Sequence, residues 1–403
     1  MSQHLFEDLL VIDCASFIAG PAAATILSDF GARVIKLEEP RLGDRYRDLI
    51  RLRDPTGETI DYFWTLDGRN KESLAIDLNE PAAQAVLARL VARADVFITN
   101  FPFATRIELG IDAETLTALN PRLVYASMTP YGEEGPERDR TAYDTTGWWA
   151  RSGLMHMVRD HAGGAYGHPV VGMGDHPTAV SLYAAIVTAL YKRQASGRGG
   201  VVSTSLLANG LWSNACQVQA ALCDIALTPR GPRGARTPLS EAFVCADGRE
   251  LLLGMTNSLK EWPLFVAALG HPEWEIDPRF ASYSARMTNA AALVALLEHV
   301  FVREPFAHWR RVLDEAGVTF SLVANVTDHP DDPQLHANGL LPDIVDGLGL
   351  KTVDSPFVVL DEPKVEPRLA PALGQHSRAL LEEFGCTADE IDALTRGAAR
   401  TEG

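Results

Sequence analysis

The sequence predicts an α/β protein with a large, doubly wound parallel sheet and a smaller α+β domain. Between residues 9 and 132, short apolar runs of strand length alternate with runs of helical periodicity, several of them Ala-rich. Alternation of this kind is typical of βαβ units, in which helices cover both faces of a parallel sheet. After a stretch rich in Pro, Gly and Arg at residues 225–237, the pattern changes to a hairpin followed by amphipathic helices. This change predicts a second domain of different architecture.

The first strand–helix–strand unit lies at the N-terminus. LLVID at residues 9–13 is an apolar run of strand length, and the Ala-rich run at 19–32 has helical spacing and a Gly near its end. A second strand is expected at 34–40. Parallel pairing through a right-handed crossover is the default connection between two such strands.

The same alternation continues along the chain. Ranges expected as strands are 73–78, 95–101 and 123–132, and those expected as helices are 80–94 and 113–121. A longer helical run begins near Thr178 and ends in the basic, glycine-rich turn YKRQASGRGG, after which 201–222 is expected to form a strand and then a helix. We assign these elements to one domain over residues 1–225.

The later part of the chain has short strands and amphipathic helices. Two β-rich runs at 241–255 surround Asp247-Gly248, a strong signal for a hairpin turn. Helices are expected at 260–270, 292–301 and 304–317, strand-like runs at 322–326 and 351–360, and final helices at 376–385 and 388–394. We assign residues 226–330 to a small α+β domain and 331–403 to a C-terminal segment that returns to the large domain.

The net charge restricts the partners of this protein. The 403-residue chain has a formal net charge of -17 and a pI near 5.1. Such a surface repels nucleic acid and anionic membranes, so we discount both as partners, whereas a small anionic ligand needs only a local basic pocket.

The cysteines and the N-terminus indicate a cytoplasmic protein. The five cysteines are scattered without a CxxC pair, which argues against a disulfide framework or a zinc site. No basic leader precedes an apolar core at the N-terminus, and the apolar runs are shorter than the roughly 20 residues that span a bilayer. No P-loop, HExxH or GxSxG motif occurs.

The stretch VVGMGDHPTA places one carboxylate, Asp175, between small residues and an apolar helical run. Asp is a favoured N-cap residue, so helix capping is the simpler interpretation of this position. A functional carboxylate is the alternative, and the residues of this stretch alone leave both open.

Three further segments are candidate ligand sites. Ala19-Gly20-Pro21 lies at a strand-to-helix junction, where helix N-termini favour phosphate, although Pro in a first helical turn is also ordinary capping chemistry. Asn100-Phe101 follows a strand, with Arg106 soon after, at the sheet edge where α/β proteins bind ligands. The charged stretch at 138–144 contains paired arginines, Tyr143 and Asp144, and could equally be a solvated loop.

These segments, in this order, resemble the class III coenzyme A transferase family. The matching stretches are FIAGPAAATILSDFGARVIKLEEPRLGD, GRNKESLAIDL, DVFITNF, NPRLVYASMTPYGEEGP, RTAYD, VVGMGDHPTA, YKRQASGRGGVVSTSLL and LGQHSRALLEEFG. No single stretch is decisive, but the ordered set is specific and covers about residues 5–396. The resemblance implies a Rossmann-like large domain and an interlocked homodimer in which each chain threads through the other.

The resemblance also implies a role for Asp175, which falls on the catalytic aspartate of the family. A carboxylate can attack a thioester to give a mixed anhydride and the CoA thiolate, and the thiolate can then form an aspartyl-CoA thioester. The acceptor acid repeats these steps in reverse. We expect the helix N-terminus to keep Asp175 ionised, and the N–H groups of Gly172 and Gly174 to be available to a developing oxyanion.

The family's coenzyme site can be carried onto this chain residue by residue. The positions implied to bind CoA are Phe17, Ile18, Ala19, Arg41, Ile76, Asn100, Phe101, Arg106, Arg140 and Tyr143. Some positions depart from the family pattern: Ile18 stands where some members have Gln, Glu39-Pro40 displaces an arginine to Arg41, and Glu108 stands where a later arginine is usual. The resemblance implies no permanently bound cofactor and no metal, with acyl-CoA and a small carboxylic acid as substrates.

Two rival functions remain. The same superfamily includes α-methylacyl-CoA racemases, which need a base on each face of the substrate and have a His-Asp pair where this chain has Tyr143-Asp144. Tyr, with an ordinary pKa near ~10, is a poor base at neutral pH, so a transferase is favoured. The chain could also be a CoA-binding subunit of a transferase with a homologous second subunit. Arginines at 138, 140 and 236 make a dicarboxylic donor such as succinyl-CoA a hypothesis.

Overall fold

The computed structural model describes residues 4–49, 61–227, 231–345, 347 and 349–395. The chain divides into two compact units. The first consists of Met1–Met155, His168–Ile225 and Leu335–Gly403, and the second of His156–Gly167 and Ala226–Gln334. Residues 228–230 of the linker expected at 225–237 lie outside the described residues. The domain boundaries expected from the sequence stay a prediction.

A parallel sheet forms the centre of the first unit. Its six strands, among the residues described, are β1 (Leu10–Cys14), β2 (Arg33–Glu38), β3 (Lys71–Ala75), β4 (Val96–Thr99), β5 (Val124–Thr129) and β6 (Gly200–Ser205). They lie in the order β3-β2-β1-β4-β5-β6, and every neighbouring pair is parallel. This is the strand order of a Rossmann-type sheet, and it confirms the predicted fold class. The order reverses between β1 and β4, where such sheets bind their ligands.

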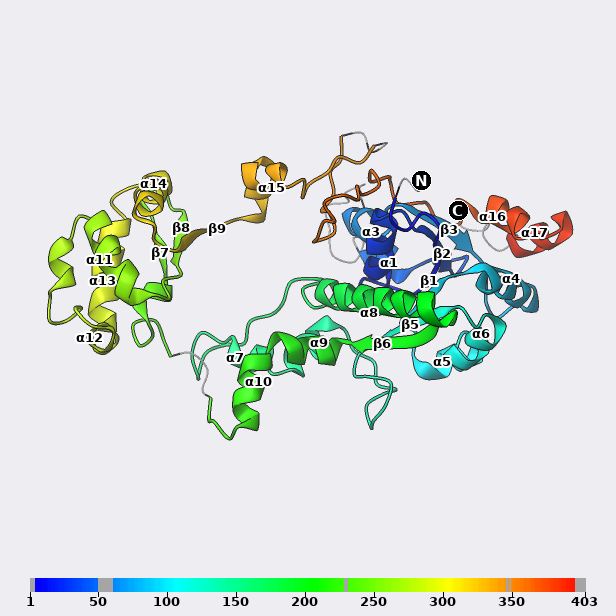
Figure 1. Ribbon diagram of the computed structural model, residues 1–403, viewed down its shortest axis with the longest axis horizontal. Coiled ribbons are helices and arrows are strands. Elements are labelled where there is room, and N and C mark those ends of the chain that lie inside the picture. The colour runs from blue at the N-terminus through cyan, green and yellow to red at the C-terminus, as the bar shows by residue number, and fades with distance from the viewer. Residues whose placement is uncertain (1–3, 50–60, 228–230, 346, 348, 396–403) are drawn as a thin grey trace. The chain divides into compact units, whose positions relative to one another are not determined.

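Helices cover both faces of this sheet (Figure 1). On one face α1 (Ala19–Asp29) and α8 (Asp175–Ser196) pack on Val11, Val34 and Val96. On the other face α4 (Pro81–Arg93), α6 (Ala113–Leu119) and α16 (Ser377–Glu383) pack on the alternate strand residues Ile12, Ile35 and Phe97. Because successive strand side chains point to opposite faces, strands buried on both faces are largely apolar, and the buried charges Asp13 on β1 and Lys36 on β2 are exceptions.

The second unit is built on a small antiparallel sheet. β7 (Ala242–Val244) and β8 (Glu250–Leu253) form the predicted hairpin, and β9 (Phe320–Val323) pairs with β8. Among the described residues, the α-helices that lie wholly within this unit are α11 (Ser258–Ala268), α12 (Tyr283–Thr288), α13 (Ala290–Phe301) and α14 (Phe306–Ala316). Their apolar faces and the sheet enclose one core that includes Phe243, Phe265 and Phe301.

The remaining described elements are short. The helices are α3 (Tyr62–Asp67), α5 (Phe103–Glu108), α7 (Leu154–Met157), α9 (Leu206–Ser213), α10 (Ala215–Leu222), α15 (Pro333–Ala337) and α17 (Ala388–Thr395). The short turns of helix are η1 (Arg45–Asp48), the π-helical η2 (Thr145–Ala150), η3 (Pro238–Ser240), η4 (Pro272–Glu275) and η5 (Val326–Asp331). No helix in the described ranges combines the length and the apolar character that crossing a membrane requires.

The strand expected at 351–360 is not present. Only isolated bridges form there, Asp343 with Lys351 and Val359 with Glu362. The segment that follows is held by single contacts, such as the Val365 amide donating to the Asp29 carbonyl. β-branched residues gave this stretch a strand-like composition, but it has no continuous partner strand with which to form a ladder.

Candidate active site

A pocket opens at the carboxyl edge of the large sheet, at the point where the strand order reverses. Its volume is about 750 Å³. Phe17, which follows β1, and Asn100, which follows β4, both line it, and Asp175 reaches it from the start of α8. Ligand pockets of this size are typical of small-molecule sites, and this edge of a doubly wound sheet is where they occur.

The structure brings most of the predicted site residues together. Those that line the pocket are Phe17, Ile18, Ala19, Asn100, Phe101, Arg140, Tyr143 and Asp175. They come from stretches separated by more than 150 residues of sequence, and the sheet places them side by side. Asp144 and Arg138 of the charged stretch at 138–144 line the pocket too.

Three predicted residues do not line this pocket. Arg41 is exposed and forms an ion pair with Glu39 at 2.8 Å. Ile76 is buried, 2% exposed, in the core beyond β3. Arg106 is also buried. Its guanidinium pairs with Glu133 at 2.9 Å and donates to the Phe101 carbonyl. Arg41 and Arg106 stand at departures from the family pattern, whereas Ile76 matches that pattern, so the assignment of these three residues to the coenzyme stays a prediction.

Asp175 is not a helix cap. It is the first residue of α8, the N-cap is Gly174, and no side chain caps this end. Within the part of the chain that the structure describes, no hydrogen bond to the Asp175 carboxylate forms, although the residue is only partly exposed. The carboxylate is therefore free to react with a ligand in the pocket.

The surroundings of Asp175 favour its neutral form. Burial, followed by the negative charge of Asp144, raises the pKa of Asp175 to about 7, while His176 acts in the opposite direction. The expectation that the helix N-terminus keeps Asp175 ionised is thus only half right. Removal from water is the largest contribution, and both protonation states are populated at neutral pH.

Asp144 fixes the backbone on which Asp175 stands. Its Oδ1 accepts the Thr145 amide at 2.7 Å, which begins the π-helical η2, and its Oδ2 accepts the Gly174 amide at 3.2 Å. The Gly174 N–H is consequently occupied, and the expectation that it is available to an oxyanion is wrong. π-helical turns of this kind are frequent at functional sites.

The two glycines of VVGMGD are required by packing. A Cβ on Gly174 would lie 2.6 Å from the Trp148 ring, and one on Gly172 would lie 2.9 Å from the His176 ring. Gly172 also has a φ of +78°, which favours glycine. Side chains at these positions would displace Trp148 or His176, and with them the start of α8.

A chain of polar side chains that was not predicted from the sequence lies beside Asp175. The His176 Nε2 lies 3.3 Å from Asp67 Oδ1, and Asp67 Oδ2 accepts the Tyr46 hydroxyl at 2.9 Å. Burial alone would lower the pKa of His176, but Asp67, Asp175 and the Gly172 carbonyl together outweigh it, and the pKa is raised. The position of His176 directly after Asp175 was the only signal for this polar chain in the sequence, because Asp67 and Tyr46 belong to no motif.

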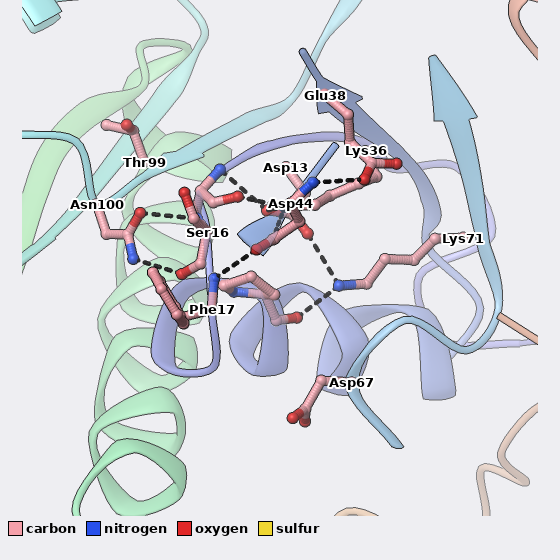
Figure 2. Close-up of polar contacts among 12 residues, drawn as sticks. Asp13, Ser16, Phe17, Lys36, Glu38, Asp44, Asp67, Lys71, Thr99 and Asn100 are labelled. Carbon is pink, nitrogen blue, oxygen red and sulfur yellow. Dashed lines mark hydrogen bonds and ion pairs between the residues drawn. The ribbon is translucent and has the colours of Figure 1, made fainter. Parts of the chain in front are cut away.

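Asn100 joins two pocket segments that follow different strands. Its Oδ1 accepts the Ser16 amide at 2.8 Å, and its Nδ2 donates to the Ser16 carbonyl at 2.7 Å (Figure 2). Both polar ends of this side chain are therefore used to hold the turn after β1. No group of His, Cys, Asp and Glu side chains able to hold a metal ion occurs among the described residues.

Comparisons with known proteins match the sequence and the fold of this chain. The model of CoA-transferase family III matches residues 6–377. The acetyl-CoA:oxalate CoA-transferase of Acetobacter aceti is 32% identical over 94% of this chain and 95% of its own length. The succinyl-CoA:glutarate CoA-transferase of Mus musculus is 30% identical over 95% of this chain and 87% of its own length. The crystal structure of a CAIB/BAIF family protein from Brucella suis superposes with a TM-score of 0.83 at 28% identity, over 95% of this chain and all of that one.

A doubly wound α/β unit with a pocket at its switch point is an architecture in which small molecules bind at this edge. The family match makes the class specific: the chain belongs to CoA-transferase family III, whose substrates are acyl-CoA and carboxylates.

Proposed function

We propose that this enzyme moves CoA from an acyl-CoA donor to a carboxylic acid, and that Asp175 is the nucleophile. The single observation that supports this role is that the Asp175 carboxylate, which has no hydrogen-bond partner among the described residues, lines a pocket of about 750 Å³. The resemblance to the family's catalytic aspartate agrees with it. Phe17, Asn100 and Tyr143 are proposed to contact the coenzyme from the other walls.

The reaction is proposed in four balanced exchanges. The Asp175 carboxylate attacks the thioester carbonyl, the C–S bond breaks, and a mixed anhydride and CoA thiolate result. The thiolate attacks the aspartyl carbonyl and the anhydride C–O bond breaks. The donor acid departs as its carboxylate, and Asp175 now carries CoA as an aspartyl-CoA thioester. The acceptor carboxylate then repeats both exchanges in reverse and restores Asp175. The overall reaction exchanges one CoA thioester for another, so neither ATP nor a metal enters the balance.

The anhydride and the enzyme thioester can be detected directly. Wild-type protein incubated with succinyl-CoA and quenched with hydroxylamine or borohydride is expected to carry a modification at Asp175 in its peptide mass map. Asp175→Ala is expected to carry none. No adduct with several donors, together with deuterium wash-in at the α-carbon of a 2-methylacyl-CoA, would contradict the transferase mechanism and favour the racemase.

The raised pKa of Asp175 predicts a pH profile. Only the carboxylate attacks, so kcat/KM is expected to rise with pH through about 7 and to fall about tenfold per pH unit on the acid side. Asp144→Asn removes a neighbouring negative charge, which lowers the pKa of Asp175 and shifts this acid limb to lower pH. Initial rates from pH 5 to pH 9 measure both.

Asp139→Asn is the control for that shift. Asp139 lines the same pocket, but it does not contribute to the raised pKa of Asp175. We expect the acid limb to stay in place in this variant. An equal shift with Asp144→Asn and Asp139→Asn, or no shift with either, would show that Asp144 does not set the protonation of Asp175.

We propose a dicarboxylic donor such as succinyl-CoA. Arg138 and Arg140 line the pocket, and the Arg138 guanidinium packs over the Phe103 ring at 3.9 Å. A cation held in this way can receive a second carboxylate, and the name of the mouse relative includes succinyl-CoA, whereas that of the Acetobacter relative includes acetyl-CoA. Succinyl-CoA is expected to have a kcat/KM at least about tenfold above that of butyryl-CoA, which has the same chain length. Equal values would exclude this specificity.

The interlocked homodimer implied by the resemblance is part of the proposal. Light scattering of the purified chain is expected to give twice the monomer mass. Turnover by that chain alone would exclude the alternative that it is a CoA-binding subunit needing a homologous partner, and absence of turnover until a partner is added would favour it.

A further inference from the structure

The turn after β1 forms a wall of the pocket in a strained conformation. Phe17 has a φ of +62°, in the left-handed region that bulky residues rarely adopt. Its ring packs edge-on against the Tyr143 ring, with centroids 5.6 Å apart, and both residues line the pocket. A strained residue at a ligand site persists only where its surroundings hold it.

Asp44 holds the backbone of Phe17. Its Oδ1 accepts the Phe17 amide at 2.9 Å and also the Tyr46 amide at 2.9 Å. Its Oδ2 lies 2.9 Å from Lys36 Nζ. Asp44 is buried, 5% exposed, and it does not itself line the pocket. It therefore connects the strained amide to a charge inside the protein (Figure 2).

Lys36 makes this anchor rigid. It projects from β2 and is fully buried, 0% exposed. Its Nζ donates to the Ala15 carbonyl in the same turn and lies 3.7 Å from Asp13 Oδ1. Asp13 Oδ1 in turn accepts the Ala15 amide at 3.3 Å. A buried cation with anions on two sides leaves little room for movement, because every displacement would leave a charge unpaired.

We propose that Asp44 is a positioning residue for the acyl-CoA site: it holds Phe17 in the left-handed conformation that sets the ring against Tyr143. This role rests on the proposed function, because it takes the pocket as the coenzyme site. Asp44 acts through Phe17 and does not touch the substrate. Its loss lets the turn relax, so the coenzyme binds less tightly while the Asp175 chemistry is retained.

Three variants test this role. Asp44→Ala removes both the amide acceptor and the charge, whereas Asp44→Asn keeps an oxygen that can accept the Phe17 amide. Asp95→Ala is the matched control, since one Asp95 oxygen accepts the Leu10 amide at 2.9 Å and the other pairs with Arg193 at 3.0 Å. Asp95 precedes β4, at the opposite edge of the sheet from the pocket.

The expected result is a split between KM and kcat. Asp44→Ala should raise the KM for acyl-CoA, and the Kd of CoA measured by calorimetry, about tenfold, with kcat changed less than about threefold. Asp44→Asn and Asp95→Ala should keep KM within about threefold of wild type, even where melting temperature falls. Equal increases in KM for Asp44→Ala and Asp95→Ala, or a tenfold increase for Asp44→Asn, would overturn the proposal.

A double-mutant cycle separates the backbone effect from general damage. Gly adopts the left-handed conformation without strain. Phe17→Gly therefore removes the phenyl ring, and it also removes the need for Asp44 to hold the backbone in this conformation. Adding a substitution at Asp44 to Phe17→Gly should then raise KM by less than about twofold. An undiminished effect in that background would show that Asp44 does not act through Phe17.

Failure of the proposed function gives a different pattern. If the wild-type protein binds no CoA, the pocket is not a coenzyme site, and the conformation of Phe17 becomes the measurement. A crystal structure of Asp44→Ala, or of Asp44→Asn if the former does not fold, then decides. The positioning role is supported if Phe17 loses its positive φ in Asp44→Ala and keeps it in Asp44→Asn. The role is overturned if Phe17 keeps its positive φ in Asp44→Ala or loses it in Asp44→Asn.

Discussion

Asp175→Ala is expected to lower kcat for CoA transfer by at least about 10³-fold, the largest functional effect that the structure predicts. The substitution removes the only carboxylate proposed to form a covalent bond with the acyl group. CoA binding should change little, because the residues proposed to contact the coenzyme, such as Phe17 and Asn100, lie on other segments of the pocket wall. Turnover of succinyl-CoA with acetate or another acid, beside calorimetric binding of CoA, measures the two effects separately.

Asp175→Asn provides the test for intact folding. An ionised carboxylate at this site opposes folding, because the pKa of Asp175 in the folded protein is raised from 3.8 to about 7. This cost is absent below the unfolded value and complete above the folded value. Asp175→Asn is therefore expected to raise the melting temperature more at pH 8 than at pH 4. An inactive variant with wild-type or higher stability places the loss in the chemistry, and rates near wild type would refute the nucleophile.

Asp13→Ala is expected to cause the largest loss of stability, about 3–5 kcal/mol in the free energy of unfolding. Asp13 Oδ2 pairs with Lys71 at 2.9 Å, and both side chains are fully buried. Burial opposes the charge on Asp13, but Lys36 and Lys71 outweigh it and hold its pKa below the ordinary value of 3.8. Without Asp13, two buried ammonium groups share fewer acceptors, and their desolvation is no longer offset. Urea unfolding at pH 7.5 measures the loss.

Asp343→Ala is the matched surface control. Asp343 pairs with Lys351 at 2.7 Å, but both side chains are exposed, so about 0–1 kcal/mol is expected. The stabilisation by Asp13 should be complete above pH about 4 and should decline as the pH falls below it, because its folded-state pKa is depressed. Similar losses for the two variants would mean that the buried network contributes no more than a surface pair.

Most of the large fold was predictable from the sequence because its signals are local. Buried parallel strands are short apolar runs, and the helices between them bury one apolar face, as the Ala-rich run of α1 does. The Asp247-Gly248 turn likewise predicted the β7–β8 hairpin. The stretch at 351–360 was mispredicted as a strand because pairing with a partner, which composition does not report, decides whether a ladder forms.

The sequence by itself determined the class of fold, the membership of the family and the candidate carboxylate, because apolar periodicity and ordered motifs are properties of neighbouring residues. Only the tertiary structure decided that Asp175 is free of capping contacts, that Arg41 and Arg106 lie away from the pocket, and that Asp44 reaches Phe17. Ion pairs and pKa values depend on distance and burial. In this protein they join residues from separate strands, helices and turns, which folding alone brings within a few ångströms of each other.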